Sequence, residues 1–145
     1  MPKNSKTKFY NSVARPWVVV DAKGATLGRL ASRVSRILQG KQKPVYSPNF
    51  LCGDKVIIIN AKDIRVSGDK YQTKIYDKYT GYPSGRKVMP LKELAAKNSP
   101  KVLRLAIKGM LPKTWLGKRM LRSLRIYEQE SHLHSAQQPQ GVLIK

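Results

Sequence analysis

The sequence predicts an α/β fold in a single domain. Two short apolar runs, residues 17–20 and 56–59, have the uninterrupted hydrophobic composition of strands buried on both faces, which is typical of a parallel sheet. Between them, residues 27–38 repeat their apolar side chains at helical spacing, with Thr26 in the N-cap position and Gly40 as a natural stop. A chain of 145 residues is most simply one domain with its own core.

Two segments flank the domain, which we expect to span residues 17–127. Residues 1–16 are polar and basic and end at a proline, so we expect an extended arm there. Residues 128–145 contain acidic residues, both histidines and several glutamines, but only one lysine. We expect this C-terminal tail to pack on or near the domain.

The second half of the domain is predicted to be mostly helical. Pro90 can open a helix, and Asn98 is placed to cap the next one. In that next helix the apolar spacing predicts that Met110 faces inward. A short helix starting at Leu116 and a final strand within residues 124–127 complete the domain.

The charge balance is the strongest functional signal in the composition. Lysine and arginine total 29 against 8 acidic residues, which gives a net charge of +21. Such a chain repels itself unless a polyanion neutralises it, so nucleic acid is the first candidate partner and an anionic membrane surface the second. No apolar run is long enough for a spanning helix. The single cysteine excludes an internal disulfide and suits a reducing compartment.

Three predicted helices carry basic side chains on the face opposite their apolar residues. A single such stripe would be an ordinary solvated surface, but its recurrence favours a functional surface for an anionic partner. Lys41 and Lys43 follow the first stripe directly, where cations also suit the end of a helix. The stripes are Arg29, Arg33 and Arg36, then Lys101, Arg104 and Lys108, and finally Lys118, Arg122 and Arg125.

The sequence predicts a short strand at residues 64–66. Residues 70–86, which follow it, are the least regular and most aromatic segment. Aromatic rings stack on unpaired bases while cations bind phosphates, so this interleaving fits RNA contact. The alternative is that the tyrosines pack on the domain and only their hydroxyls reach out. Both interpretations remain open. The alternating residues are Tyr71, Tyr76, Tyr79 and Tyr82 with Lys70, Lys74, Lys78 and Arg86.

Two other classes of function are weaker candidates. An enzyme acting on nucleic acid would need Asp21, Asp54 or Asp63 to hold Mg²⁺, and only the last two are close in sequence. His132 and His134 have no evident third metal ligand, so polar packing or RNA hydrogen bonding fits them better. An anionic-membrane binder would need a basic amphipathic helix with aromatics exposed on its apolar face.

Motifs distributed over nearly the whole chain resemble those of bacterial-type large-subunit ribosomal protein thirteen. The most specific are K-G-M-L-P-K at residues 108–113 and H-x-H-x-A-Q-Q-P at residues 132–139. The others are W-x-V-V-D-A with T-L-G-R-L-A at 17–31, R-I-L-x-G-K-x-K at 36–43, G-D-x-V-I-I-I-N-A at 53–61, T-G-Y-P-x-G at 80–85 and L-G at 116–117.

The chain departs from this family pattern at three places. Residues 47–52 read S-P-N-F-L-C, where the family usually has T-P-H and an acidic residue. Asn49 and Leu51 stand at the places of that histidine and acid, so any role of these two family residues is not carried over. Lys78-Tyr79 stands for R-H, and Ser84 stands for the first glycine of P-G-G. Lys78 and Tyr79 largely keep the charge or hydrogen bonding of the residues that they replace.

The resemblance implies a three-layer α/β domain with a small parallel sheet flanked by helices. It also implies a structural, non-catalytic protein that binds large-subunit ribosomal RNA (rRNA) and acts early in subunit assembly. Its partners would be this rRNA and neighbouring large-subunit proteins, with no cofactor, metal, membrane or small-molecule substrate. Its expected location is the ribosome in a bacterial cytoplasm, with an organelle ribosome as the alternative.

The side chains expected to contact RNA combine the basic stripes, the aromatic loop and the tail histidines. They are Arg29, Arg33, Arg36, Lys41, Lys43, Tyr46, Lys74, Lys78, Tyr79, Tyr82, Arg86, Lys108, Lys113, Lys118, Arg119, Arg122, His132 and His134.

Overall fold

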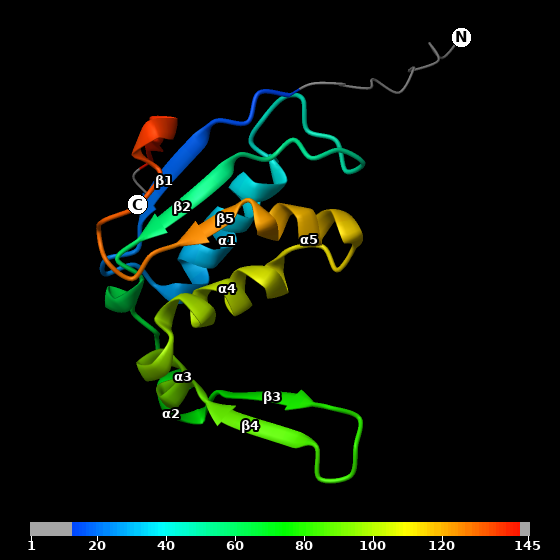
Figure 1. Cartoon of the computed structure of the whole chain (residues 1–145), viewed down its shortest axis with the longest axis vertical. Coiled ribbons are helices and arrows are strands. Elements are labelled where there is room, and N and C mark those ends of the chain that lie inside the picture. The colour runs from blue at the N-terminus through cyan, green and yellow to red at the C-terminus, as the bar shows by residue number, and fades with distance from the viewer. Residues whose placement is uncertain (1–12, 143–145) are drawn as a thin grey trace.

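The centre of the protein is a four-stranded parallel sheet. A computed structural model describes residues 13–142, so most of the predicted arm at residues 1–16 lies outside the described residues. The strands lie in the order β5-β2-β1-β6, and Figure 1 shows helices gathered on one face of the sheet. The predicted α/β domain with a small parallel sheet is therefore confirmed. The strands are β1 (Trp17–Asp21), β2 (Lys55–Ile59), β5 (Leu124–Ile126) and β6 (Gln140–Gly141).

The two central strands form where the apolar runs predicted them. Val18 pairs with Val56 and Val20 with Ile58, and these four side chains point into the helix-covered core. Ile57 lies on the other face of β2 and is also fully buried. Burial on both faces explains why the sequence of β2 shows no polar alternation.

Helix α1 (Leu27–Gln39) follows β1 and covers the sheet. Thr26 occupies the N-cap position but its side chain makes no capping bond. Gly40 ends the helix with a φ of 77°, and its N–H donates to the carbonyls of Arg36 and Ile37. Glycine adopts this left-handed backbone without steric cost, which explains the predicted stop.

Three further helices follow, α3 (Leu91–Lys97), α4 (Ser99–Met110) and α5 (Trp115–Arg122). Helices α4 and α5 lie on this face of the sheet, whereas α3 lies beyond the sheet and packs against α4 (Figure 1). Asn98 accepts a hydrogen bond from the Lys101 N–H at 2.9 Å, so the predicted cap of α4 is confirmed. Helices α1 and α4 pack directly against each other beneath the sheet, and α5 lies beside both (Figure 1).

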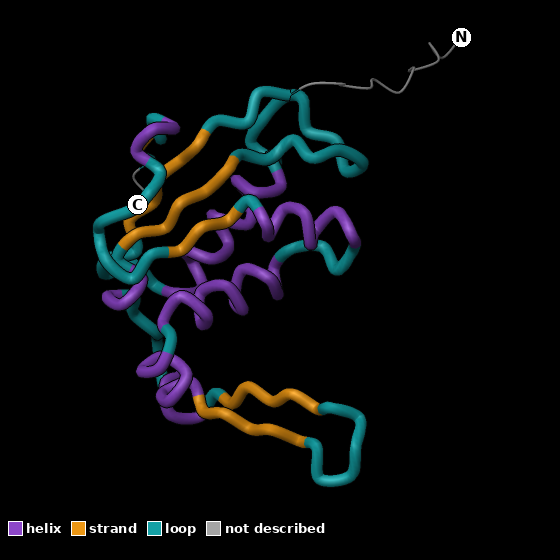
Figure 2. Tube along the Cα trace, viewed as in Figure 1, coloured by secondary structure: helices purple, strands orange, loops and turns teal. Residues whose placement is uncertain are grey.

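Residues 70–90 form a projecting hairpin, where the sequence predicted an irregular loop. It consists of α2 (Lys70–Thr73), β3 (Ile75–Tyr79) and β4 (Arg86–Pro90), and β3 and β4 are antiparallel. Figure 2 shows this pair of strands extending away from the central sheet. The strands were missed because most of their side chains are exposed, which removes the apolar alternation on which strand prediction depends.

The strand suggested for residues 64–66 is wrong. A 3-10 turn, η1 (Ala61–Asp63), follows β2, and only Arg65 then makes a single bridge to Thr26. The Arg65 N–H donates to the Ala25 carbonyl at 2.9 Å, and the Leu27 N–H donates to the Arg65 carbonyl at 2.8 Å. The segment thus pairs with the turn before α1 and never reaches the sheet.

The segment after β5 crosses to the far edge of the sheet and pairs with β1. Before β6 it forms a 3-10 turn, η2 (Ser135–Gln137). The His134 ring stacks on Trp17 of β1, with ring centroids 4.9 Å apart. Among residues 13–142, no helix has the length and hydrophobicity needed to cross a bilayer.

Candidate nucleic-acid interface

The outer face of α1 presents three arginines to solvent. Arg29, Arg33 and Arg36 are all exposed, while Leu30 and Val34 on the opposite face are buried. None of the three arginines has an acidic partner within the described part of the chain. The hydrophobic face therefore fixes the helix and leaves its guanidinium groups available for an anion.

A hollow of about 610 Å³ lies between the start of α1, helix α2 and the end of α4. Its basic side chains are Arg29, Lys70 and Lys74, which come from two helices and the C-cap that follows the second. Gly109 and Met110 form its wall on the α4 side. The fold thus brings Lys74, at the base of the hairpin, to the first arginine of α1.

A second hollow of about 450 Å³ lies further along α1 and is lined by Arg33, Arg36 and Lys41. Met110 lines both hollows, so they adjoin and form one basic surface along α1. The expectation that Met110 faces inward is wrong, because its side chain is 42% exposed. Met110 is the last residue of α4, and the next residue, Leu111, turns into the core in its place.

A smaller hollow of about 150 Å³ lies between the end of α4 and α5, with Lys108, Lys113 and Lys118 around it. Its apolar wall includes Leu111, which is buried, and Leu121. Arg119 and Arg122 are exposed on the neighbouring part of α5, whereas Lys101 and Arg104 are exposed further back along α4. The predicted stripes on these two helices therefore reach solvent.

Arg125 does not belong to the stripe on α5, contrary to the helical spacing. Helix α5 ends at Arg122 with Ser123 as its C-cap, and Arg125 lies in β5. Its guanidinium donates to the Arg122 carbonyl at 2.9 Å and to the Leu124 carbonyl at 3.4 Å. Arg125 thus closes the end of the helix instead of extending its basic face.

The hairpin, which projects from the rest of the protein (Figure 1), carries a separate group of predicted contacts. Tyr79 and Tyr82 are 66% and 74% exposed, and Lys78 is exposed beside them. Arg86 is also exposed, but its guanidinium lies 3.2 Å from the Asp77 carboxylate. The strands of the hairpin and the turn between them therefore present these two rings with the partly neutralised Arg86 and two exposed lysines without an ion pair among the described residues, Lys78 and Lys87.

The two interpretations of the tyrosines apply to different residues. Tyr76 packs against the core, and its buried hydroxyl has no partner among the described atoms. Burial raises the pKa of Tyr76 above its ordinary value, because the ionised form would lose solvation. Tyr71, Tyr79 and Tyr82 remain exposed. Of the four tyrosines in residues 70–86, these three are therefore available for base stacking.

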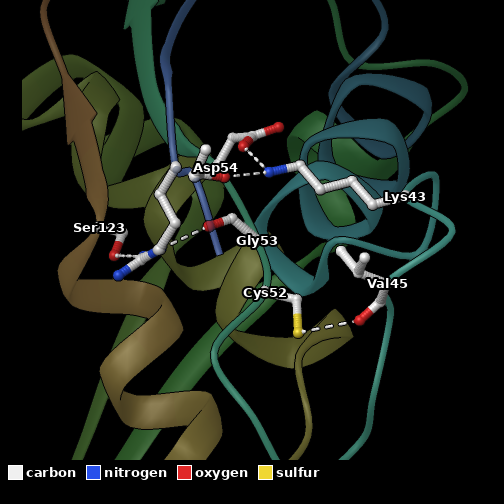
Figure 3. A network of polar contacts seen from close by, with 8 residues as sticks. Lys43, Val45, Cys52, Gly53, Asp54 and Ser123 are labelled. Atoms are coloured by element: carbon white, nitrogen blue, oxygen red, sulfur yellow. Dashed lines mark hydrogen bonds and ion pairs between the residues drawn. The ribbon is translucent and has the colours of Figure 1, made fainter. Parts of the chain in front are cut away.

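Lys43 is bound within the protein. Its ammonium forms an ion pair with Asp54, shown in Figure 3, and donates to the Ala14 carbonyl at 2.8 Å. Asp54 is only 5% exposed, so its carboxylate depends on this pair. Tyr46, in the same loop, is 37% exposed. It does not line either of the hollows beside α1.

The same network fixes the loop before β2. The Cys52 thiol donates to the Val45 carbonyl at 3.5 Å (Figure 3). Arg15 donates to the Gly53 carbonyl and to the Ser123 hydroxyl, each at 2.7 Å. Burial lowers the pKa of Arg15 from its ordinary value, and the nearby charge of Arg119 acts in the same direction.

The tail histidines pack in an aromatic cluster on the sheet. His134 stacks on Trp17 and meets Tyr127 edge-on, with a centroid distance of 6.0 Å to Tyr127. The His134 N–H donates to Nδ1 of His132 at 3.3 Å. This arrangement fits polar packing, one of the two roles that the sequence favoured beside RNA hydrogen bonding, and neither histidine lines the hollows beside α1 and α5.

The aspartates of the weaker enzymatic hypothesis do not converge. Asp54 is paired with Lys43, and Asp21 accepts hydrogen bonds from the Asn60 amide and the Lys23 N–H, both at 2.9 Å. Across residues 13–142, no group of three or more histidine, cysteine or acidic side chains is placed to hold a metal ion.

Comparison with known proteins identifies the family. The model of the family "Ribosomal protein L13" matches residues 15–133. The chain belongs to the ribosomal protein L13 family. A relative named large ribosomal subunit protein uL13 from Symbiobacterium thermophilum is 50% identical over 140 residues, which cover 95% of this chain and 98% of the relative.

Other bacterial members of the L13 family are similarly close. The protein of the same name from Dictyoglomus thermophilum is 49% identical over 91% of this chain and 93% of its own length. That from Thermus thermophilus is 45% identical over 94% and 98%. L13 proteins are structural ribosomal proteins, so this chain is a ribosomal constituent and not an enzyme.

The structure adds one ring to the predicted contacts of this L13 family member and gives a predicted cation a defined place. Lys70, which the sequence set among the cations alternating with tyrosines, lines the first hollow. Trp115 is 67% exposed, with the Arg119 guanidinium 4.5 Å from its ring centroid. Helical spacing carried a signal for this pair, because Arg119 follows Trp115 by four residues.

Proposed function

We propose that the chain is a structural protein of the large ribosomal subunit that binds large-subunit rRNA and supports early assembly in the cytoplasm. The observation that carries this proposal is the continuous basic surface along α1. Its hollows are lined by Arg29, Arg33, Arg36, Lys41 and Lys74, and within the described residues none of these cations is in an ion pair. Folded RNA supplies the dense negative charge that such a surface requires.

The proposed mechanism of RNA binding depends on how the fold positions these cations. The three arginines extend from α1, whose opposite face is buried in the core, so their charges hold fixed relative positions. Lys41 and Lys74 lie directly after the ends of helices α1 and α2. Phosphates from two RNA helices brought to this surface repel each other less, because the cations neutralise them. RNA of this kind is recognised mainly by its shape and backbone. Neighbouring large-subunit proteins would then bind the remaining exposed surface.

A membrane surface fits the same charge less well. An interfacial helix needs an exposed apolar face to enter the lipid. In α5, Met120 is buried and Leu116 and Leu121 are partly buried against the core. Only Trp115 remains as a large exposed apolar side chain on this helix.

Crosslinking of the tagged chain in cells, followed by sequencing of the attached RNA, tests the proposal. We expect the reads to concentrate at a few sites in large-subunit rRNA. A variant with Arg29, Arg33 and Arg36 changed to glutamate should lose most of these reads while remaining folded. Reads spread over many messenger RNAs, or almost no crosslinked RNA, would contradict rRNA binding as the function of this surface.

A further inference from the structure

Trp115 is an exposed ring in a basic surrounding. Its side chain is 67% exposed at the start of α5, whereas Trp17 is partly buried against His134. Exposure of a large ring has no benefit for the folded chain itself, since burying such a ring is a large hydrophobic gain. The ring is therefore a candidate for contact with a partner.

Arg119 holds this ring in place from one side. The guanidinium carbon lies 4.5 Å from the ring centroid, within the range of a cation–π contact. Lys118 and Arg122 extend from the same exposed side of the helix, three and seven residues after Trp115. Helix α5 contains no acidic residue, so the potential around the ring is positive throughout.

The first turn of α5 is held in place by a cap and by close packing. The Thr114 hydroxyl accepts a hydrogen bond from the Gly117 N–H at 3.4 Å, which caps the helix one residue before Trp115. Gly117 packs so closely on the preceding loop that an added Cβ would lie 1.9 Å from the Pro112 carbonyl oxygen. Met120, one turn further on, is buried in the core. A ring fixed in this way loses little conformational entropy on binding.

The lysine-lined hollow adjoins this ring. Lys118 belongs both to the hollow and to the exposed side of α5, and Lys113 precedes Trp115 by two residues. The hollow has a volume of about 150 Å³ and is lined by three lysines, which suits a phosphate group rather than a base. A ring beside a cationic hollow can bind the base and the backbone of one nucleotide strand together.

We propose that Trp115 and Arg119 form a stacking platform for an unpaired base of the RNA, and that the hollow of Lys108, Lys113 and Lys118 binds a phosphate of the same strand. This inference rests on the proposed rRNA binding and deepens it. A protein partner fits less well, because protein interface cores are depleted of charge, whereas this single ring is surrounded by cations.

The test compares two variants that leave the net charge unchanged. Purified full-length chain is titrated with full-length large-subunit rRNA at several salt concentrations. Trp115→Ala should weaken binding roughly 5- to 150-fold, the range expected for loss of one stacked base. Its salt slope should match that of the original chain, because no phosphate contact is removed. Trp115→Phe retains a ring and should recover most of the affinity.

Fluorescence gives a second readout that does not depend on affinity. Trp17→Phe leaves Trp115 as the only tryptophan, and stacking on a base should then quench its emission when single-stranded RNA is added. Duplex RNA at equal phosphate concentration should quench it much less, because its bases are already stacked. Lys97→Ala, at an exposed position of α3, is the control for a surface change away from the ring and should leave quenching and affinity unaltered.

The outcomes separate this inference from the proposed function. Failure of the original chain to bind rRNA would overturn both. If the original chain binds rRNA while Trp115→Ala, still folded by thermal melting, binds equally well, the stacking platform is overturned and the proposed function stands. If such a variant binds RNA normally but fails to enter subunits, Trp115 contacts a neighbouring protein instead.

Discussion

Gly117 stands where the first turn of α5 meets the backbone of the preceding loop. A Cβ at this position would lie 1.9 Å from the Pro112 carbonyl oxygen, and backbone cannot move aside as a flexible side chain can. We expect Gly117→Ala to lower the free energy of unfolding by about 2 kcal/mol, typical of overpacking against rigid structure. Urea denaturation of the purified chain measures this change.

Gly109→Ala is the matched control for that substitution. Gly109 also lies in a helix, α4, but a Cβ there would have no atom within 4 Å. Alanine should therefore stabilise the chain by roughly 0.5–1 kcal/mol, because it lowers the entropy of the unfolded state and favours helix. Equal effects at the two glycines would show that the contact with Pro112 does not constrain α5.

Lys43, which the sequence predicted to contact RNA, forms an ion pair with Asp54 within the protein. Because Asp54 is nearly buried and paired with Lys43, removal of the ammonium leaves a carboxylate without its counter-charge. We predict that Lys43→Met destabilises the fold by on the order of 3 kcal/mol, as for other broken buried pairs. The urea midpoint of the variant provides the measurement.

Lys41→Met tests the specificity of that effect. Lys41 is exposed and has no ion pair among the described residues, so its loss should change stability by less than about 0.5 kcal/mol. It should instead lower the salt dependence of RNA binding, since a phosphate contact is lost. A Lys43→Met chain as stable as the Lys41→Met chain would contradict a structural role for the pair with Asp54.

At the scale of the element, α5 divides into a packing face and a charged face. Met120 is buried, whereas Lys118, Arg119 and Arg122 are exposed and make no ion pair within residues 13–142. Changing these three cations to glutamate should abolish incorporation into large subunits, because repulsion replaces attraction to phosphate. Sedimentation of cell extracts followed by detection of the tagged chain measures incorporation.

The control reverses three exposed lysines outside the proposed surface, Lys62, Lys92 and Lys97, for the same change in net charge. That variant should still enter subunits. Both variants should melt near the temperature of the original chain, since none of the six side chains is buried. Normal incorporation of the α5 variant would show that this face is not in contact with RNA.

The elements that the sequence predicted are those whose signals are local. The apolar runs of β1 and β2, the cap at Asn98 and the stop at Gly40 each depend on residues close in the chain, and each is confirmed. Strand β6 was missed because Gln140–Gly141 pairs with β1 through its backbone alone and contains no apolar side chain. No local pattern could reveal that contact.

In the candidate site, too, the sequence predicted the local features and missed those that depend on contacts between distant segments. Helical spacing predicted that the arginines of α1 share an exposed face, since that depends on α1 alone. It could not predict the hollows, which require α1, α2 and α4 to meet. The pair of Lys43 with Asp54 likewise depends on the path of the whole loop between them. Whether the named side chains contact RNA stays a prediction.

For the whole molecule, the net charge of +21 acts on folding and on binding in opposite ways. The free chain repels itself, and added salt screens this repulsion, so its melting temperature should rise with NaCl. RNA binding should weaken, because salt competes with phosphate contacts. If about 6–10 phosphates are neutralised, affinity falls roughly 10³- to 10⁵-fold between about 50 and about 200 mM salt.

Thermal melting and RNA titration of one preparation, over one salt series, measure both effects together. The variant with Lys118, Arg119 and Arg122 changed to glutamate has a net charge lower by six, so both its melting temperature and its residual RNA affinity should depend less on salt. A melting temperature that falls with salt would mean that internal ion pairs outweigh self-repulsion. That result is not expected, because only three ion pairs occur within residues 13–142, and two of them are between exposed side chains.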